Sequence, residues 1–135
     1  GMMKDCAEVG SQFVVSPGAT VELIEANRKS DIPLLPGIAT PSEAMGLMGE
    51  GYEFLKFFPA EQAGGVKYLK AIAPVLQGIK FCPTGGLNPK NSPQYLALDN
   101  VICVGGSWVA PSDKISAGDW DGISALAAEA AQLAG

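Results

Sequence analysis

The feature of this 135-residue sequence that most constrains its fold is a regular alternation of short apolar runs with helical segments. The runs recur about twenty-odd residues apart, and this alternation is typical of βα units that build a parallel sheet. The run 101–104 is apolar throughout, as a strand covered on both faces would be. The sequence therefore predicts an α/β fold with parallel strands at 12–16, 32–38, 54–58, 80–83 and 101–104.

The segments between these runs carry helix-start signals. Thr40, Pro41 and Glu43 fit a capping box with proline at the first helical position. Ser92 and Pro93 mark another start. Apolar side chains recur every three to four residues, so we expect each helix to present one face to the sheet. The clearest stripes are Val66, Leu69, Ile72 and Leu76 in one segment, and Trp120, Ile123, Leu126, Ala130 and Leu133 in the last.

Composition favours one globular domain and excludes several functions. With 47% hydrophobic residues and no linker, residues 1–135 are expected to form a single domain, and Gly1-Met2 is interpreted as a cloning remnant ahead of Met3. A net charge of −5 without a basic cluster predicts no nucleic-acid or membrane partner. No apolar run approaches the ~20 residues of a membrane span and no signal peptide is recognisable, so a cytoplasmic protein is expected.

Residue types that are missing or rare narrow the chemistry further. Histidine is absent and arginine occurs once, at Arg28, which excludes a histidine base and a multi-arginine clamp. Cys6, Cys82 and Cys103 are an odd number without a CxxC pair, so neither a disulfide framework nor a zinc site is expected. Cys82 and Cys103 fall within predicted strands and are interpreted as small buried hydrophobes. We expect no metal and no cofactor.

Glycine and proline gather just after the predicted strands, where βα turns carry the active sites of barrels and open α/β sheets. Two glycine pairs follow the last two strands, in the runs 84–86 and 105–107. Backbone N–H groups at such pairs bind anions without interference from a Cβ, which favours a phosphate or carboxylate site. The alternative is plain turn geometry. Thr84 is a candidate for orienting a substrate carboxylate or hydroxyl and Ser107 for donating to phosphate, unless both bond only to their own turns.

Lys56 lies in the apolar run 54–59, where a charged amine has no ordinary place. Because side chains alternate along a strand, Phe54, Lys56 and Phe58 share one face, and both faces are largely apolar. Loss of hydration favours the neutral, nucleophilic amine, so we interpret Lys56 as a Schiff-base lysine for a carbonyl substrate. The alternative is a surface lysine on an edge strand. Glu61, the nearest carboxylate in sequence, is a candidate for proton transfer or a helix-start residue.

Five motifs in register resemble one known family, the 2-keto-3-deoxy-6-phosphogluconate (KDPG) and 4-hydroxy-2-oxoglutarate (KHG) aldolases. The resemblance covers essentially the whole chain. It rests on Phe13-Val14-Val15-Ser16-Pro17-Gly18, Ile32-Pro33-Leu34-Leu35-Pro36-Gly37-Ile38, Leu55-Lys56-Phe57-Phe58-Pro59-Ala60-Glu61, Phe81-Cys82-Pro83-Thr84-Gly85-Gly86 and Gly105-Gly106-Ser107-Trp108.

The resemblance implies a (β/α)₈ barrel that cleaves a 2-keto acid into pyruvate and an aldehyde without a metal. It implies that Lys56 forms the imine, and that Thr84, Phe58 and Pro17 surround the pyruvate portion. The implied phosphate-binding residues are Gly85, Gly86, Gly105, Gly106 and Ser107.

The chain also departs from the family, since it resembles only the fourth to eighth strands of such a barrel. The family's glutamate acid/base, its carboxylate-binding arginine and a threonine belong to the missing strands, and Glu61 is the one candidate replacement. Bare strand edges and an uncovered interior face favour a homo-oligomer in which another copy covers that face. Two functions stay open: an aldolase with weakened turnover, or an inert fragment that at most binds phosphate.

Overall fold

The computed structural model describes residues 1–134, and every strand pair in it is parallel. One ladder joins β1 (Val14–Val15) to β2 (Leu34–Leu35). The other places β4 (Phe54–Phe57) between β3 (Gly37–Ile38) and β5 (Lys80–Pro83). The predicted α/β class with parallel strands is confirmed.

The predicted strand 32–38 is split at Pro36. Residues before it pair with β1, since the N–H of Ser16 donates to the carbonyl of Leu35 (3.2 Å). Residues after it pair with β4, where Lys56 N–H donates to the Pro36 carbonyl (2.8 Å). Proline has no N–H that could donate to a neighbouring strand, so the pairing changes at this residue. The segment before Pro36 belongs to the β1–β2 ladder and the segment after it to the β3–β4 ladder.

The segment 101–104 does not form the continuous strand that the sequence predicts. It is joined to β5 by two isolated parallel bridges. The first pairs Phe81 with Val101, and the second pairs Thr84 with Gly105. Three steps along β5 therefore match four steps along its neighbour, which is a β-bulge.

Pro83 gives a physical reason for this bulge. In an unbroken parallel ladder the N–H of residue 83 would donate to the carbonyl of Ile102, and proline lacks that donor. The ladder resumes one residue late, with Gly105 N–H donating to the Pro83 carbonyl (2.9 Å). Ile102 is 51% exposed and Cys103 is also exposed, so a strand buried on both faces was the wrong prediction.

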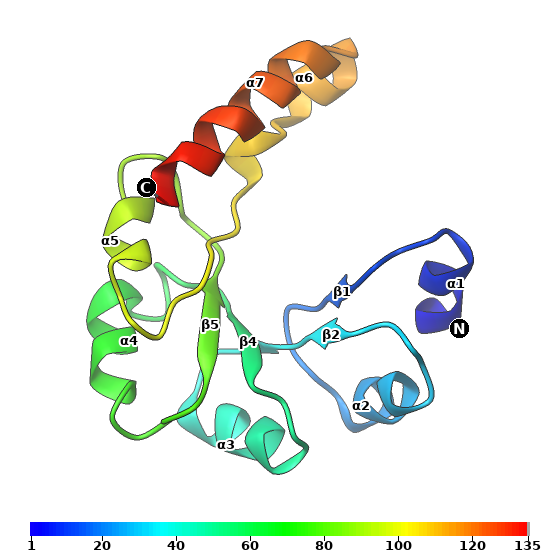
Figure 1. Ribbon diagram of the computed structural model, residues 1–135, viewed down its shortest axis with the longest axis vertical. Coiled ribbons are helices and arrows are strands. Elements are labelled where there is room, and N and C mark those ends of the chain that lie inside the picture. Colours follow the sequence, from blue (N-terminus) through cyan, green and yellow to red (C-terminus); the bar gives the residue numbers. More distant parts are fainter. Residues whose placement is uncertain (135) are drawn as a thin grey trace.

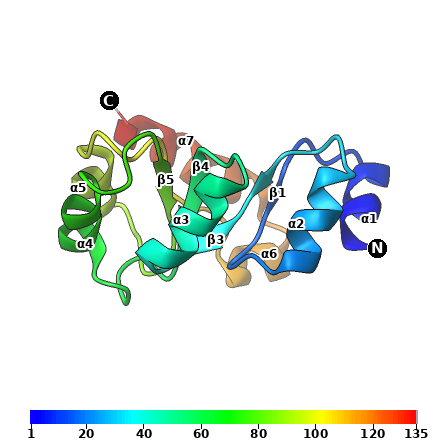
Figure 2. The same cartoon turned by 90° about the horizontal axis from the view of Figure 1, so that it is seen from below.

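Three helices cover one face of the β3–β5 sheet (Figures 1 and 2). They are α3 (Pro41–Gly49), α4 (Gly65–Ile72) and α5 (Ser92–Leu96). The capping box at the start of α3 is confirmed, because Thr40 Oγ1 accepts from Glu43 N–H and the Glu43 carboxylate accepts from Thr40 N–H. These helices and the sheet enclose the main hydrophobic core.

The core lies on the helix side of the sheet and leaves the other side uncovered. Leu55, Phe57 and Phe81 are fully buried, and the Phe57 ring stacks on Tyr68 with centroids 5.4 Å apart. On the other side Phe54 is 49% exposed. We call the side of the sheet that carries Phe54 and Lys56 the open face.

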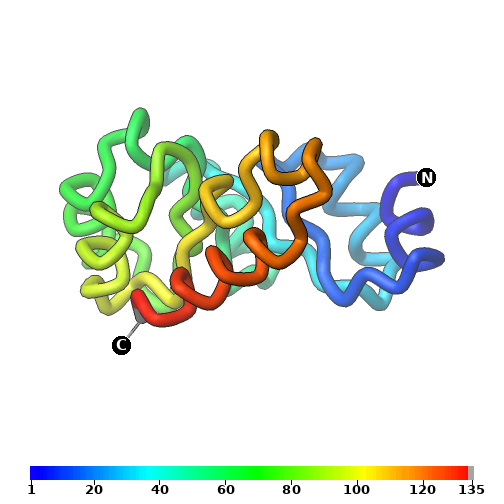
Figure 3. Tube along the Cα trace, turned by 90° about the horizontal axis from the view of Figure 1, so that it is seen from above, coloured from blue at the N-terminus to red at the C-terminus, as the bar shows by residue number. Residues whose placement is uncertain are grey.

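The C-terminal segment forms an arm that extends away from the sheet (Figure 1). Seen from above, this arm crosses in front of the rest of the chain (Figure 3). The predicted stripe of its long helix does not pack on the sheet: Trp120 is 62% exposed and no residue of α7 is buried. The helix contacts its own neighbours α6 and η1 instead, and η2 contacts α5. The arm comprises η1 (Ser107–Val109), α6 (Ser112–Ala117), α7 (Trp120–Ala131) and η2 (Gln132–Ala134).

The N-terminal helices α1 (Met2–Glu8) and α2 (Val21–Arg28) lie at the opposite end of the molecule from α4 and α5 (Figure 2). Within the described residues β1 pairs only with β2, and the segment after α5 pairs only with β5. Both outer edges therefore lack partners, as the sequence predicted. None of the described helices has the length and apolar character needed to cross a membrane.

Candidate active site

Strand register brings the predicted site residues to one edge of the sheet. Lys56 in β4 is aligned with Cys82 in β5, and Thr84, just beyond β5, is bridged to Gly105. Because the strands are parallel, their carboxyl ends meet at this edge, which is where α/β enzymes place their catalytic groups.

Lys56 is half-buried on the open face, so it is less sheltered than the sequence predicts. The prediction that both faces of the strand are covered was wrong. Leu55 and Phe57 are buried beneath the helices, while Phe54, on the same face as Lys56, is largely exposed. The Lys56 Nζ lies 4.7 Å from the ring centroid of Phe58, within cation–π distance. The Lys56 amine therefore lies against the Phe58 ring.

Phe58 and Pro17 line the same cavity of about 240 Å³, together with residues from the start of α3. Close backbone packing forms its wall. A Cβ on Gly37 would lie 2.2 Å from the carbonyl carbon of Pro17, so only glycine allows this approach. The structure therefore places two of the predicted pocket residues around one cavity. Lys56 and Thr84 do not line this cavity, and Lys56 is connected with it through its contact with Phe58.

The loop after β5 needs both of its glycines. Gly85 and Gly86 have φ values of +103° and +76°, in the region that disfavours a side chain. A Cβ on Gly85 would also lie 3.1 Å from Cα of Pro59. Within the described residues the N–H groups of Gly85 and Gly86 donate to no protein acceptor. Turn geometry explains the glycines, and the same turn leaves two adjacent donors free for an anion.

The second glycine pair has a different local role. Gly105 donates its N–H to Pro83, and a Cβ on Gly106 would lie 1.7 Å from Cζ3 of Trp108. Glycine at 106 therefore makes room for the Trp108 ring, which packs on the core. The Gly106 N–H has no acceptor in the described part of the chain, and Ser107 is exposed at the start of η1. The bridge from Thr84 to Gly105 sets the two loops side by side.

Glu61 is not brought to the Lys56 amine. Its carboxylate accepts a hydrogen bond from the hydroxyl of Tyr95, a residue of the core on the helix side of the sheet. Burial, together with this hydrogen bond, raises the pKa of Tyr95 and keeps it a donor. Among the described contacts no hydrogen bond or ion pair joins Glu61 to Lys56. The Glu61 N–H donates to the Gly85 carbonyl (3.2 Å), so Glu61 holds the glycine loop.

Cys82 and Cys103 are the residues whose place the sequence reading missed. Cys82 is half-buried beside Lys56 and Cys103 is exposed, so their interpretation as buried hydrophobes was wrong. A hydrogen bond from Cys103 lowers the pKa of Cys82 to about 7, with help from Thr84 and the charge of Lys56. Alternation alone puts Cys82 on one of two faces. Only the register, which the sequence does not show, pairs it with Lys56.

Comparison with known proteins agrees with this geometry. A family model described as "Aldolase: KDPG and KHG aldolase" matches residues 1–126. The chain belongs to the KDPG and KHG aldolase family. The resemblance inferred from five motifs is therefore confirmed, and with it the assignment to a family of aldolases, which are lyases.

Relatives in this aldolase family are longer than the chain. The KHG/KDPG aldolase of Escherichia coli K12 is 50% identical over 130 residues, which are 96% of this chain and 61% of that protein. A KDPG aldolase from Legionella pneumophila, solved with pyruvate captured as a covalent carbinolamine, is 51% identical with a TM-score of 0.88, covering 93% of this chain and 61% of its own. The Zymomonas mobilis ZM4 enzyme, solved with 3-phosphoglycerate, is 43% identical with a TM-score of 0.87, covering 96% and 60%.

Proposed function

We propose that this chain carries the imine-forming and phosphate-binding part of a class I aldolase, with Lys56 as the Schiff-base lysine. The observation that supports this most is the position of the Lys56 amine. It lies over Phe58 near the carboxyl end of β4, and the neighbouring strand β5 leads into the Gly85–Gly86 loop with its free N–H groups. In the Legionella relative pyruvate is bound covalently as a carbinolamine, the species that an amine and a keto group form.

The chemistry follows from the amine. Neutral Lys56 adds to the 2-keto carbon to give a carbinolamine, which loses water to become a protonated imine. That cation accepts the electron pair of the breaking carbon–carbon bond as the substrate's hydroxyl gives its proton to a water molecule, so an aldehyde leaves and an enamine remains. Protonation of the enamine and addition of water release pyruvate and restore the amine. Phe58, Thr84 and Pro17 are proposed to hold the pyruvate portion.

The proposed substrate is KDPG, which gives pyruvate and glyceraldehyde 3-phosphate, with KHG, which gives pyruvate and glyoxylate, as the second candidate. The free N–H groups of Gly85, Gly86 and Gly106, with the exposed Ser107, are donors suited to a phosphate. Gly105 lets this loop approach Thr84 closely. The Zymomonas relative was solved with a phosphorylated ligand, which supports this choice. Glu61 is proposed as the support of this loop, in place of the acid/base role expected from sequence.

We further propose that residues 1–135 fold as one domain, a partial (β/α)₈ barrel, and that the open face is covered by another copy in a homo-oligomer. Apolar side chains on and beside this face support the proposal: Phe54 is 49% exposed, Ile102 51% and Phe13 62%. Exposed apolar surface of this kind drives association. We also propose a cytoplasmic location. The proposed partners are pyruvate, 2-keto acids and another copy of the chain.

Cleavage and enamine formation are tested separately. Cleavage of KDPG is followed by coupling the released pyruvate to lactate dehydrogenase, and enamine formation by exchange of the pyruvate methyl protons for deuterium in NMR. Both steps need a base, since exchange removes a methyl proton from the imine and cleavage removes the substrate's hydroxyl proton. General acid/base groups contribute ~10²–10⁴-fold, so with no carboxylate bonded to Lys56 among the described residues both rates are expected to be low but above the rates without protein. Lys56→Arg should abolish both, while Lys67→Arg, on the exposed side of α4, should change neither.

A specific alternative is the inert fragment. It predicts that inorganic phosphate still perturbs the amide signals of Gly85 and Gly86 while pyruvate exchange stays at the rate without protein. That combination would overturn the imine chemistry and leave the anion site standing.

A further inference from the structure

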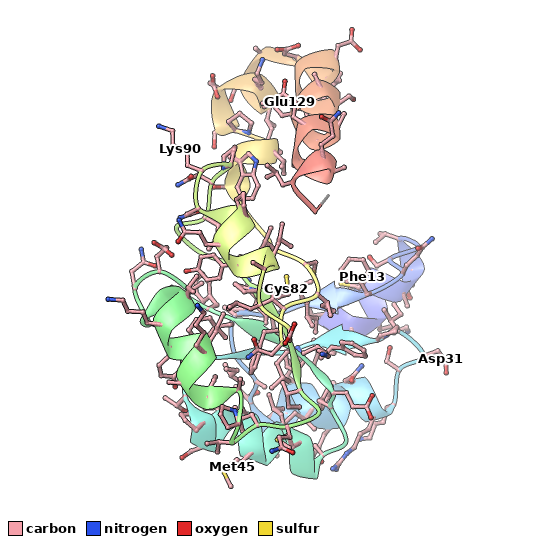
Figure 4. All side chains as sticks on the ribbon, turned by 60° about the vertical axis from the view of Figure 1, so that its left-hand side comes forward. Phe13, Asp31, Met45, Cys82, Lys90 and Glu129 are labelled. Atoms are coloured by element: carbon pink, nitrogen blue, oxygen red, sulfur yellow. The ribbon has the colours of Figure 1, made fainter. Side chains whose placement is uncertain are left out.

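Two cysteines from neighbouring segments of the sheet meet beside the Lys56 amine, and the proposed aldolase chemistry uses neither. Cys82 lies in β5, opposite Lys56 in register, and its sulfur lies 3.9 Å from the Thr84 hydroxyl. Cys103 lies in the segment that pairs with β5. Figure 4 shows Cys82 near the middle of the view, away from the C-terminal arm marked by Glu129.

The β-bulge places Cys103 beside Cys82 on the neighbouring segment. Between the bridges, the two residues Cys82 and Pro83 face three residues of the neighbouring segment, with Cys103 in the middle. The extra residue breaks the alternation: Val101 is buried and Val104 packs on the core, whereas Ile102 and Cys103 between them are exposed. Cys103 therefore lies on the side of the sheet away from the core, where Lys56 and Cys82 also lie. Neighbouring strands lie ~4.8 Å apart, within the ~4.4–6.8 Å Cα separation that a disulfide spans. Both cysteines are free in this structure.

We propose that Cys82 and Cys103 form a redox-active dithiol that exchanges with low-molecular-weight disulfides such as glutathione disulfide. In the first step the Cys82 thiolate attacks one sulfur of glutathione disulfide, whose S–S bond breaks, and one glutathione leaves as a thiolate. In the second step Cys103 loses its proton and attacks the Cys82 sulfur, and the second glutathione leaves. Two protein thiols are oxidised to one disulfide, and one glutathione disulfide is reduced to two thiols.

The electrostatics of the pair favour this order. The Cys103 hydrogen bond and the Lys56 charge make Cys82 the more acidic thiol, and the thiolate is the attacking form. The hydrogen bond with Cys82 raises the pKa of Cys103. Once Cys82 is a mixed disulfide it carries no negative charge, so Cys103 releases its proton more easily. Cys82 is the neighbour of Lys56 in register, so both residues lie on the open face.

The third cysteine provides an internal control. Cys6 lies in α1, remote in the fold from β5. The reduced full chain is incubated with glutathione disulfide, quenched with acid, alkylated with iodoacetamide, and analysed by intact mass and peptide mapping. In the wild type two thiols should no longer react with iodoacetamide, and no glutathione should remain attached. The Cys6 thiol should stay reduced and therefore become alkylated. Cys6→Ser should behave like the wild type.

The single variants separate the two steps. Cys103→Ser should accumulate one glutathione per chain, on Cys82, because no second thiol displaces it. Cys82→Ser should keep Cys103 reduced. The proposal is overturned if glutathione attaches to Cys6 or Cys103 as fast as to Cys82, if the wild type retains glutathione on Cys82, or if the disulfide links two chains. This result is independent of whether Lys56 forms an imine, since no keto acid is present.

Discussion

Substituting Gly86 by alanine tests how the proposed anion loop is held. A Cβ at this position would lie 2.8 Å from both Cβ and Cγ of Glu61, and φ is +76°. Glu61 cannot retreat freely, because its carboxylate is bound by the buried Tyr95. The added methyl must therefore push the loop, and the free N–H groups move with it.

Gly78 provides a matched control. Its φ is +89°, but a Cβ there would have no neighbour within 4 Å. Gly78→Ala should therefore show only the cost of a left-handed alanine, ~1–2 kcal/mol. Gly86→Ala should show that cost plus overpacking of ~1–3 kcal/mol.

Urea unfolding gives the stability difference, provided that the slope with denaturant is the same in both variants. Phosphate binding is followed by amide chemical shifts, and we expect Gly86→Ala to weaken it by about tenfold or more, a loss of ~1.4 kcal/mol, while Gly78→Ala leaves it unchanged. Equal destabilisation by the two substitutions, or undiminished phosphate affinity in Gly86→Ala, would refute the reasoning about Glu61.

Three further predictions concern a helix cap, a thiol and the open face. Thr40→Ala removes the hydroxyl that caps α3 and should lower the free energy of unfolding by about 1 kcal/mol in urea titrations. Because the pKa of Cys82 is lowered to about 7, its rate of alkylation by iodoacetamide should rise with pH and be half-maximal near that value. Cys103→Ala removes the thiol donor that is the largest cause and should move this midpoint upward, and an unmoved midpoint would contradict the hydrogen bond. Phe54→Lys places a charge on the open face and should shift sedimentation toward monomer, whereas Val75→Lys, 66% exposed but outside that face, should not; a wild type that is already monomeric would rule out the homo-oligomer.

The strand and helix order was predictable because it depends on local pattern. The predicted 80–83 is β5 without change of bounds, and the capping box starts α3 where the sequence puts it. The predictions failed where the structure of a segment depends on a residue that is distant in the sequence. The run 101–104 is apolar enough for a buried strand, but Pro83 on its neighbour withholds the donor that would continue the ladder.

The site was predictable in its residues and less so in its surroundings. Lys56, Phe58 and the glycine loops stand out by composition, and the structure brings them to one edge of the sheet. The exposure of Lys56 depends on what covers the open face, and its own strand does not specify that. The pairing of Cys82 with Cys103 depends on a one-residue shift in register, which no periodicity reveals.

The most direct test of the central claim is to trap the imine. The chain is incubated with pyruvate and borohydride, weighed intact, and mapped by peptide mass. A covalent imine that is reduced adds the mass of a lactate-derived group to the peptide containing Lys56, and we expect this adduct in the wild type and its loss in Lys56→Arg. No adduct, or an adduct that persists in Lys56→Arg, would contradict the assignment of Lys56 as the Schiff-base lysine.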